Sequence, residues 1–138
     1  MKTFSHNIGF ISLLFCITLV LSGCSDDKAP AKVTGTITLD GKPVADATVT
    51  FTPTNGERIS QAMTDYYGQY ELRFTAQLKG AIVGTHRVTI QTGDLERPSD
   101  ADATMRPETI PSKYNAESEL TATVKSGKNV VHFELSSD

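Results

Sequence analysis

The sequence is poor in the residue types that usually carry catalysis or covalent cross-links. Its 138 residues include 2 cysteines, 3 histidines and no tryptophan. Cys16 and Cys24 lie inside and just after one apolar run near the amino terminus, so they predict no disulfide within a folded domain. No serine shows a nucleophile elbow with a histidine and carboxylate partner. The sequence therefore predicts a protein that is not an enzyme and has no cofactor.

The chain also lacks clusters of basic residues. It has 13 lysines and arginines against 16 aspartates and glutamates, and its formal net charge is −3. Nucleic-acid-binding domains usually present basic side chains, often interleaved with aromatic ones, to the phosphate backbone. Nucleic acid is therefore not an expected partner.

No apolar run is long enough for a permanent transmembrane helix. The run from Ile8 to Leu21 has 14 residues, whereas a helix needs roughly 20 to cross the hydrocarbon core. Lys2 precedes this run, and no acidic residue occurs before Asp26. This arrangement is typical of a signal peptide.

The run ends in LSGC, which finishes at Cys24 and resembles the lipobox of bacterial lipoproteins. In that family the signal peptide is cleaved directly before the cysteine, whose thiol and new amino terminus become acylated. The resemblance implies a signal peptide at 1–23, a lipid attachment site at Cys24 and a lipidated tether at 24–32. The protein is then exported and anchored to a bacterial membrane, on the periplasmic or outer-membrane face, with the lipid bilayer as a partner. Whether that membrane is the inner or the outer one stays open.

From residue 33 onward, apolar side chains recur at every second position, and no window shows sustained helical periodicity. Turn sequences separate the runs, such as Asp40-Gly41 and Asn55-Gly56, in which glycine accepts a positive φ. Short alternating runs with frequent turns are typical of a β-sandwich. We expect seven antiparallel strands between residues 33 and 135, near 32–39, 44–53, 59–64, 69–74, 85–90, 120–124 and 130–135.

Three stretches in this region resemble the carboxypeptidase regulatory-like domain, a transthyretin-like (prealbumin-like) fold. They are VTGTITLDGKPVADATVTF, MTDYYGQYEL and GTHRVTI, and IPSKYN at 110–115 resembles a stretch of small bacterial lipoproteins that carry this domain. The resemblance implies an all-β, seven-stranded antiparallel Greek-key β-sandwich with Tyr70 pointing inward. It implies no activity. One departure is His86, where the family usually has an aromatic residue.

A long polar segment from 93 to 119 interrupts the strands. Loops of this length in compact domains are often functional. Its acidic residues could offer oxygen ligands to calcium, but their spacing does not match an EF-hand and Arg97 lies among them. We therefore predict no metal site and keep as weak calcium candidates Asp94, Glu96, Asp100 and Asp102.

The IPSKYN stretch in this loop has two interpretations. Lys113 and Tyr114 could form a contact surface, or Ile110 and Tyr114 could close one end of the sandwich. The second interpretation is favoured, because a long loop needs apolar anchors in order to dock.

Side-chain parity and position bear on two further kinds of site. His86 is expected to point inward and His132 outward, so they make a poor pair of metal ligands. Lys32 and Asn129 lie at strand ends and are the nearest candidates for a covalent lysine–asparagine cross-link, but both are expected to be exposed.

The function expected from these observations is a membrane-anchored, non-enzymatic accessory or protein-interaction module of the cell envelope. Its partner would be an unknown envelope protein or polysaccharide. The alternative is a carbohydrate-binding β-sandwich, in which the adjacent Tyr66 and Tyr67 would contact the sugar.

Overall fold

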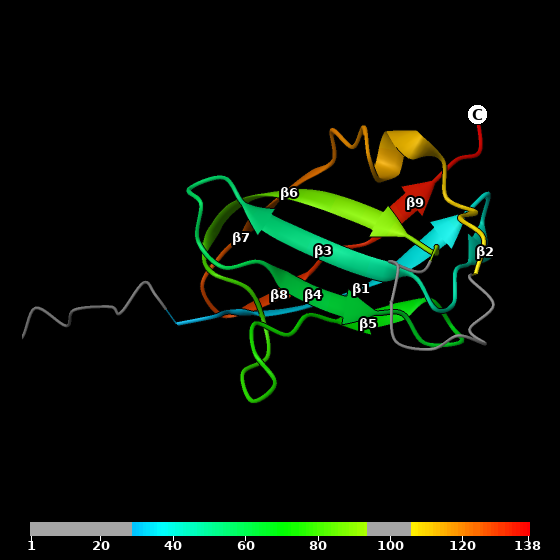
Figure 1. Ribbon diagram of the computed structural model, residues 1–138. Helices are drawn as coiled ribbons and strands as arrows, with labels where there is room; N and C mark the ends of the chain where they lie inside the picture. The colour runs from blue at the N-terminus through cyan, green and yellow to red at the C-terminus, as the bar shows by residue number, and fades with distance from the viewer. Residues whose placement is uncertain (1–28, 94–105) are drawn as a thin grey trace, which may run out of the picture.

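The alternation of apolar and polar residues produces two β-sheets that pack face to face (Figure 1). The computed structural model describes residues 29–93 and 106–138, so the expected signal peptide, Cys24 and the four calcium candidates lie outside the described residues. The strands are β1 (Lys32–Leu39), β2 (Lys42–Pro43), β3 (Thr48–Pro53), β4 (Ser60–Met63), β5 (Gln69–Glu71), β6 (Gly84–Gln91), β7 (Thr121–Val124), β8 (Lys128–Val130) and β9 (Phe133–Leu135), with a 3₁₀ turn, η1 (Ser112–Tyr114). The predicted all-β class is confirmed.

The first sheet is built around β1. Its neighbours β2 and β5 pair with it in antiparallel orientation, whereas β8 and β9 pair with it in parallel. The second sheet has the order β4-β3-β6-β7, and all its neighbours are antiparallel.

Two predicted details of these sheets are wrong, namely one strand's length and its direction, and one predicted domain boundary is wrong as well. The expected strand at 130–135 is divided into β8 and β9, and both are parallel to β1. The chain crosses from the second sheet to the first between β7 and β8, and residue alternation carries no information about strand direction. The tether expected at 24–32 is too long, because Ala31 is buried against Ala81 and β1 already begins at Lys32.

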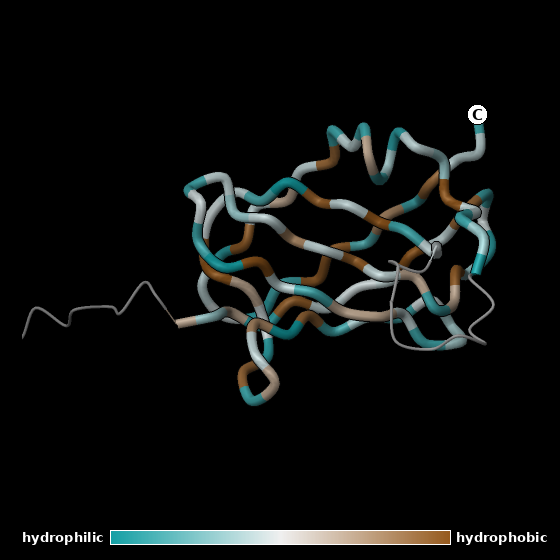
Figure 2. Tube along the Cα trace, in the orientation of Figure 1, coloured by the Kyte–Doolittle hydropathy of each residue, from teal (hydrophilic) through white to brown (hydrophobic). Residues whose placement is uncertain are grey.

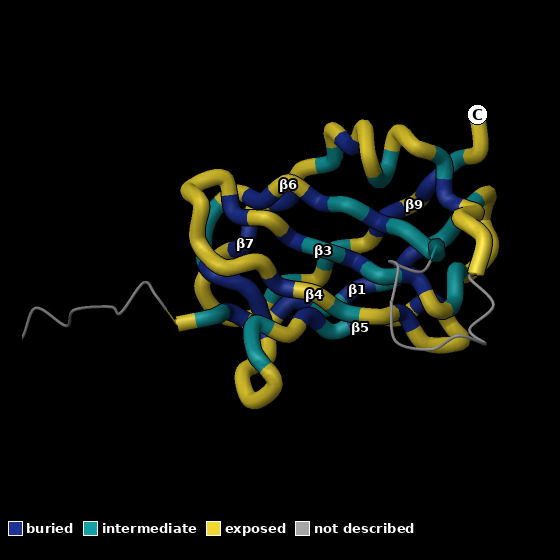
Figure 3. The backbone as a smooth tube through the Cα atoms, in the orientation of Figure 1, coloured by how far each residue is buried: buried dark blue, intermediate teal, exposed yellow. Residues whose placement is uncertain are grey.

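The predicted inward positions form the core between the sheets. Buried residues alternate with exposed ones along the strands (Figure 3), and the apolar positions lie where the two layers meet (Figure 2). Phe51 is the largest fully buried side chain, and its ring meets that of Phe133 edge to face at 6.2 Å. Burying a side chain of this size contributes about 1.5–3 kcal/mol. The core also contains Val33, Ile37, Val49, Leu72, Val88, Ile90, Val124 and Leu135.

The turn between β1 and β2 confirms the hairpin predicted at Asp40-Gly41. Asp40 has a φ of 50° and Gly41 a φ of 78°. Two consecutive positive φ angles define the primed turn that matches the twist of a two-residue hairpin. The short local signal predicts this turn because its two φ angles depend on the turn residues themselves.

Candidate functional site

An open groove lies on the face of the first sheet that points away from the core. It has a volume of about 520 Å³. Its floor comes from outward-facing residues of β1, because Lys32, Thr34 and Thr36 alternate with the buried Val33 and Ile37. The walls combine polar and apolar groups, namely Met63, Asp65, Gln69, Glu71, Val130 and His132. Such a lining can make both hydrogen bonds and apolar contacts with a ligand.

The turn that begins at Asp65, one of the groove residues, displays the predicted tyrosine pair. Tyr66 is 80% exposed and Tyr67 is 67% exposed, and their rings meet edge to face at 5.2 Å. The Asp65 carboxylate fixes the turn by accepting hydrogen bonds from the backbone N–H groups of Tyr67 and Gln69, both at 2.9 Å. The two rings are therefore held outward by a braced turn and contribute nothing to the core.

Exposed apolar side chains also occur in the groove itself. Met63 at the end of β4 is 57% exposed, and Val130 at the end of β8 is 67% exposed. Both line the groove. Exposed apolar and aromatic side chains are typical of contact surfaces, and the groove residue Asp65 directly precedes the two tyrosines. We call Met63, Tyr66, Tyr67 and Val130 the tyrosine surface.

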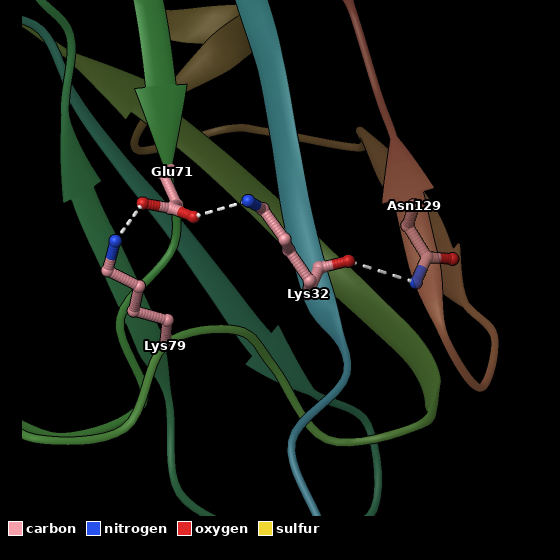
Figure 4. A network of polar contacts seen from close by, with 4 residues as sticks. All are labelled: Lys32, Glu71, Lys79 and Asn129. Carbon is pink, nitrogen blue, oxygen red and sulfur yellow. Dashed lines mark hydrogen bonds and ion pairs between the residues drawn. The ribbon is translucent and has the colours of Figure 1, made fainter.

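A chain of ion pairs crosses one end of the groove (Figure 4). The Glu71 carboxylate pairs with the Lys79 ammonium at 2.6 Å and with the Lys32 ammonium at 3.0 Å. These two partners, Lys79 first, hold the pKa of Glu71 below its usual value. The groove therefore keeps one carboxylate whose charge is already compensated.

The same geometry argues against the cross-link considered between Lys32 and Asn129. The Lys32 ammonium is directed toward Glu71, while the Asn129 amide donates to the Lys32 backbone carbonyl at 3.2 Å (Figure 4). The Asn129 side chain also accepts from the backbone N–H of Lys125 and donates to its carbonyl. Asn129 thus ties the β7–β8 turn to β1.

His132 is exposed, as predicted, and at the break between β8 and β9 its side chain provides a hydrogen-bond partner for β1. Its Nδ1 atom lies 3.1 Å from the backbone nitrogen of Thr36 and 2.7 Å from the Thr36 hydroxyl. A backbone N–H can only donate, so Nδ1 is the acceptor and the ring proton is on Nε2. His132 therefore has a structural task in the wall of the groove.

His86 points inward, as predicted, and is 1% exposed. Burial lowers the pKa of its imidazole, and the contact between Nδ1 and the Gly84 carbonyl at 3.1 Å only partly opposes that effect. Among the described residues Nε2 has no hydrogen-bond partner. His86 packs against Phe51 and is not near a possible co-ligand, since residues 29–93 and 106–138 contain no cluster that could hold a metal ion.

The described part of the long loop packs on the sandwich, as the favoured interpretation predicts. Ile110 is 3% exposed, and Tyr114 packs against the core and accepts a hydrogen bond from the Ser136 backbone at 3.1 Å. The Lys113 ammonium lies 5.1 Å from the centre of the Tyr114 ring. Lys113 and Tyr114 do not line the groove.

Glu108, which the sequence does not single out, fastens the base of this loop. Its carboxylate accepts hydrogen bonds from the backbone N–H groups of Thr92 at 3.0 Å, Gly93 at 3.2 Å and Ile110 at 2.7 Å. Burial raises the pKa of Glu108, but these bonds outweigh it and lower the pKa overall. Nothing in the local sequence distinguishes this glutamate from its acidic neighbours.

Within the described segments, no helix is long and apolar enough to cross a membrane.

Comparisons with known proteins add little to this geometry. No protein-family model matches the chain, and no curated protein matches it. Among solved structures the chain is similar to a DUF3823 family protein from Parabacteroides merdae, with 16% sequence identity and a TM-score of 0.40. The match covers 77% of this chain and 46% of that protein, so this chain spans less than half the length of its neighbour.

Proposed function

We propose that the protein is a non-enzymatic binding module of the bacterial cell envelope. In this proposal acylated Cys24 holds it at a membrane, and the tyrosine surface contacts another envelope protein. The proposal includes the resemblance of the sequence to lipoproteins with a carboxypeptidase regulatory-like domain.

The exposure of Tyr66 and Tyr67 on a braced turn is the observation that carries the interaction role. Tyr66 and Tyr67 are 80% and 67% exposed, so their rings contribute little burial to the stability of the fold. Aromatic residues are enriched in the centres of protein interfaces. The Asp65 carboxylate orders the turn before any partner arrives. Such preorganisation lowers the entropy lost on binding.

A carbohydrate ligand is the second candidate, and the polar lining of the groove favours it. Thr34, Gln69 and His132 bring hydrogen-bonding groups to the groove that starts at the tyrosine turn. However, the two rings meet at 86°, so they do not form one flat platform for consecutive sugar rings. The protein partner therefore ranks first.

Site-specific photo-cross-linking in the native envelope tests the contact. A photoreactive phenylalanine analogue replaces Tyr67 in the full-length chain, and the matched control carries it at the exposed Glu57, before the opposite end of β4. We expect one protein adduct at position 67 that is absent at position 57 and that disappears when Tyr66→Ala and Val130→Ala are added. Identical adducts at both positions would contradict the proposal.

Glycan binding is measured separately, with the full-length chain in nanodiscs applied to a glycan array. Binding that is lost in Tyr66→Ala plus Tyr67→Ala would place the carbohydrate role first. Membrane anchoring has its own control, because a labelled fatty acid supplied to the cells should be incorporated into the wild-type chain and not into Cys24→Ala.

A further inference from the structure

The outer edge of β7 presents backbone groups that the described structure leaves unpaired. The Val88 N–H donates to the Leu120 carbonyl at 2.8 Å, and β7 then continues antiparallel to β6. Hydrogen-bonded and non-hydrogen-bonded pairs alternate in such a ladder. The backbone groups of Thr121 and Thr123 consequently point away from β6, and none of the hydrogen bonds found in residues 29–93 and 106–138 uses them.

Two other edges of the sandwich are blunted, unlike the edge of β7. The free edge of β4 is occupied at Gln61, whose backbone N–H and carbonyl both bond to Arg73. The edge of the first sheet that β8 and β9 form is interrupted where β8 ends and β9 begins. Proteins normally break or cover exposed edges in these ways to prevent strand addition. The regular edge of β7 has no such protection among the described residues.

The charged side chains at the two ends of this edge have opposite signs, so they are complementary to those of a second, antiparallel copy. Glu119 before β7 and Lys125 after it are exposed, and neither takes part in an ion pair within the described ranges. They lie at equal distances in sequence from Ala122, the midpoint between them. A strand with opposite charges placed symmetrically about its centre matches a second copy of itself in antiparallel orientation.

We propose that two copies of the chain associate through antiparallel pairing of their β7 strands about a two-fold axis at Ala122. Thr121 of each copy then lies opposite Thr123 of the other, and the two residues exchange backbone hydrogen bonds. Glu119 of each copy lies opposite Lys125 of the other. The second sheet becomes continuous through both copies.

Asn129 limits the length of this contact. Its side chain already occupies the backbone N–H and carbonyl of Lys125 at 2.9 Å and 2.8 Å. The backbone pairing therefore ends at Thr123, and Lys125 contributes only its ammonium group. An interface this short is expected to be weak in solution, and shared attachment to a membrane would raise its effective concentration.

Sedimentation equilibrium of the full-length chain in density-matched detergent tests the association. Thr123→Pro removes an N–H that points away from β6, so it blocks the added strand and keeps the internal ladder. Thr123→Ala is the matched control. We expect a concentration-dependent dimer that Thr123→Pro abolishes and Thr123→Ala retains, with unchanged thermal unfolding in both variants.

Charge reversal tests the register. Glu119→Lys or Lys125→Glu alone places like charges opposite each other at both ends, and each should raise the dissociation constant about tenfold. The double variant restores the pairs, and so does an equimolar mixture of the two single variants, which should form heterodimers. A monomer at every concentration overturns the proposal, as does a dimer that tolerates Thr123→Pro or a mixture that fails to associate.

Discussion

The hydroxyl of Tyr70 donates a 2.7 Å hydrogen bond to the backbone carbonyl of Val131, at the break between β8 and β9. In a regular parallel ladder with this register, that carbonyl would accept from the N–H of Thr36. Instead, the Thr36 N–H donates to Nδ1 of His132, and the Val131 carbonyl accepts from the Tyr70 hydroxyl. The absence of a side chain at Gly35 makes room, because a Cβ there would lie 1.7 Å from the Val131 oxygen.

Tyr70→Phe should destabilise the protein by about 1–3 kcal/mol, because it leaves the Val131 carbonyl without its partner in a part of the fold that is largely shielded from water. Urea unfolding measures the loss. Tyr67→Phe removes an exposed hydroxyl and is the control, with an expected change within about 0.5 kcal/mol. Equal effects of the two substitutions would contradict this role of Tyr70.

Thr64 joins the segment before β3 to the end of β4. Its hydroxyl accepts from the Ala47 N–H at 2.8 Å and donates to the Val44 carbonyl at 2.7 Å, and the side chain is buried. Thr64→Val keeps the shape but leaves both groups unpaired, so we expect a loss of about 2–3 kcal/mol. Thr64→Ser keeps the hydroxyl and should cost about 1 kcal/mol or less. Denaturant unfolding of the two variants compares them, and a Val variant as stable as the Ser variant would refute the hydrogen-bonding role.

Glu108 should make the base of the long loop sensitive to acid. Its pKa is lowered in the folded state, so the stabilisation is complete above the unfolded pKa of about 4.3 and is lost as the pH falls through the lower folded value. Hydrogen exchange at pH 7 should be faster at Thr92, Gly93 and Ile110 in Glu108→Gln. Glu117→Gln is the control, because the Glu117 carboxylate accepts only from the Ser112 hydroxyl within the described structure. Unchanged exchange in Glu108→Gln would show that the carboxylate does not hold the loop.

His86 should reduce stability in mildly acidic solution. Burial lowers the pKa of its imidazole in the folded state, whereas an unfolded histidine has a pKa of about 6.5. As the pH falls below that value the unfolded chain binds a proton first, so the free energy of unfolding decreases; above it His86 has no effect. His86→Phe should lie within about 1.5 kcal/mol of the wild type at pH 8 and should lose less stability between pH 7 and pH 5. A variant with the wild-type pH dependence would exclude His86 as the cause.

The sequence by itself determined the class of fold and most of the core. Alternation identified the inward faces of β1, β3 and β6, including Val33, Phe51 and His86, because a strand sends successive side chains to opposite faces. It also located the primed turn at Gly41 and the exposed tyrosine pair. These features depend on neighbouring residues, and the chain specifies them locally.

Only the tertiary structure decided which strands meet. The parallel pairing of β8 and β9 with β1, the hydrogen bonds of Tyr70 with Val131 and of His132 with Thr36, and the groove all join residues far apart in sequence. The same holds for Glu108, whose carboxylate is distinguished by the N–H groups around it. Local periodicity fixes the face on which a side chain lies, but the strand beside it is chosen by packing of the whole sandwich.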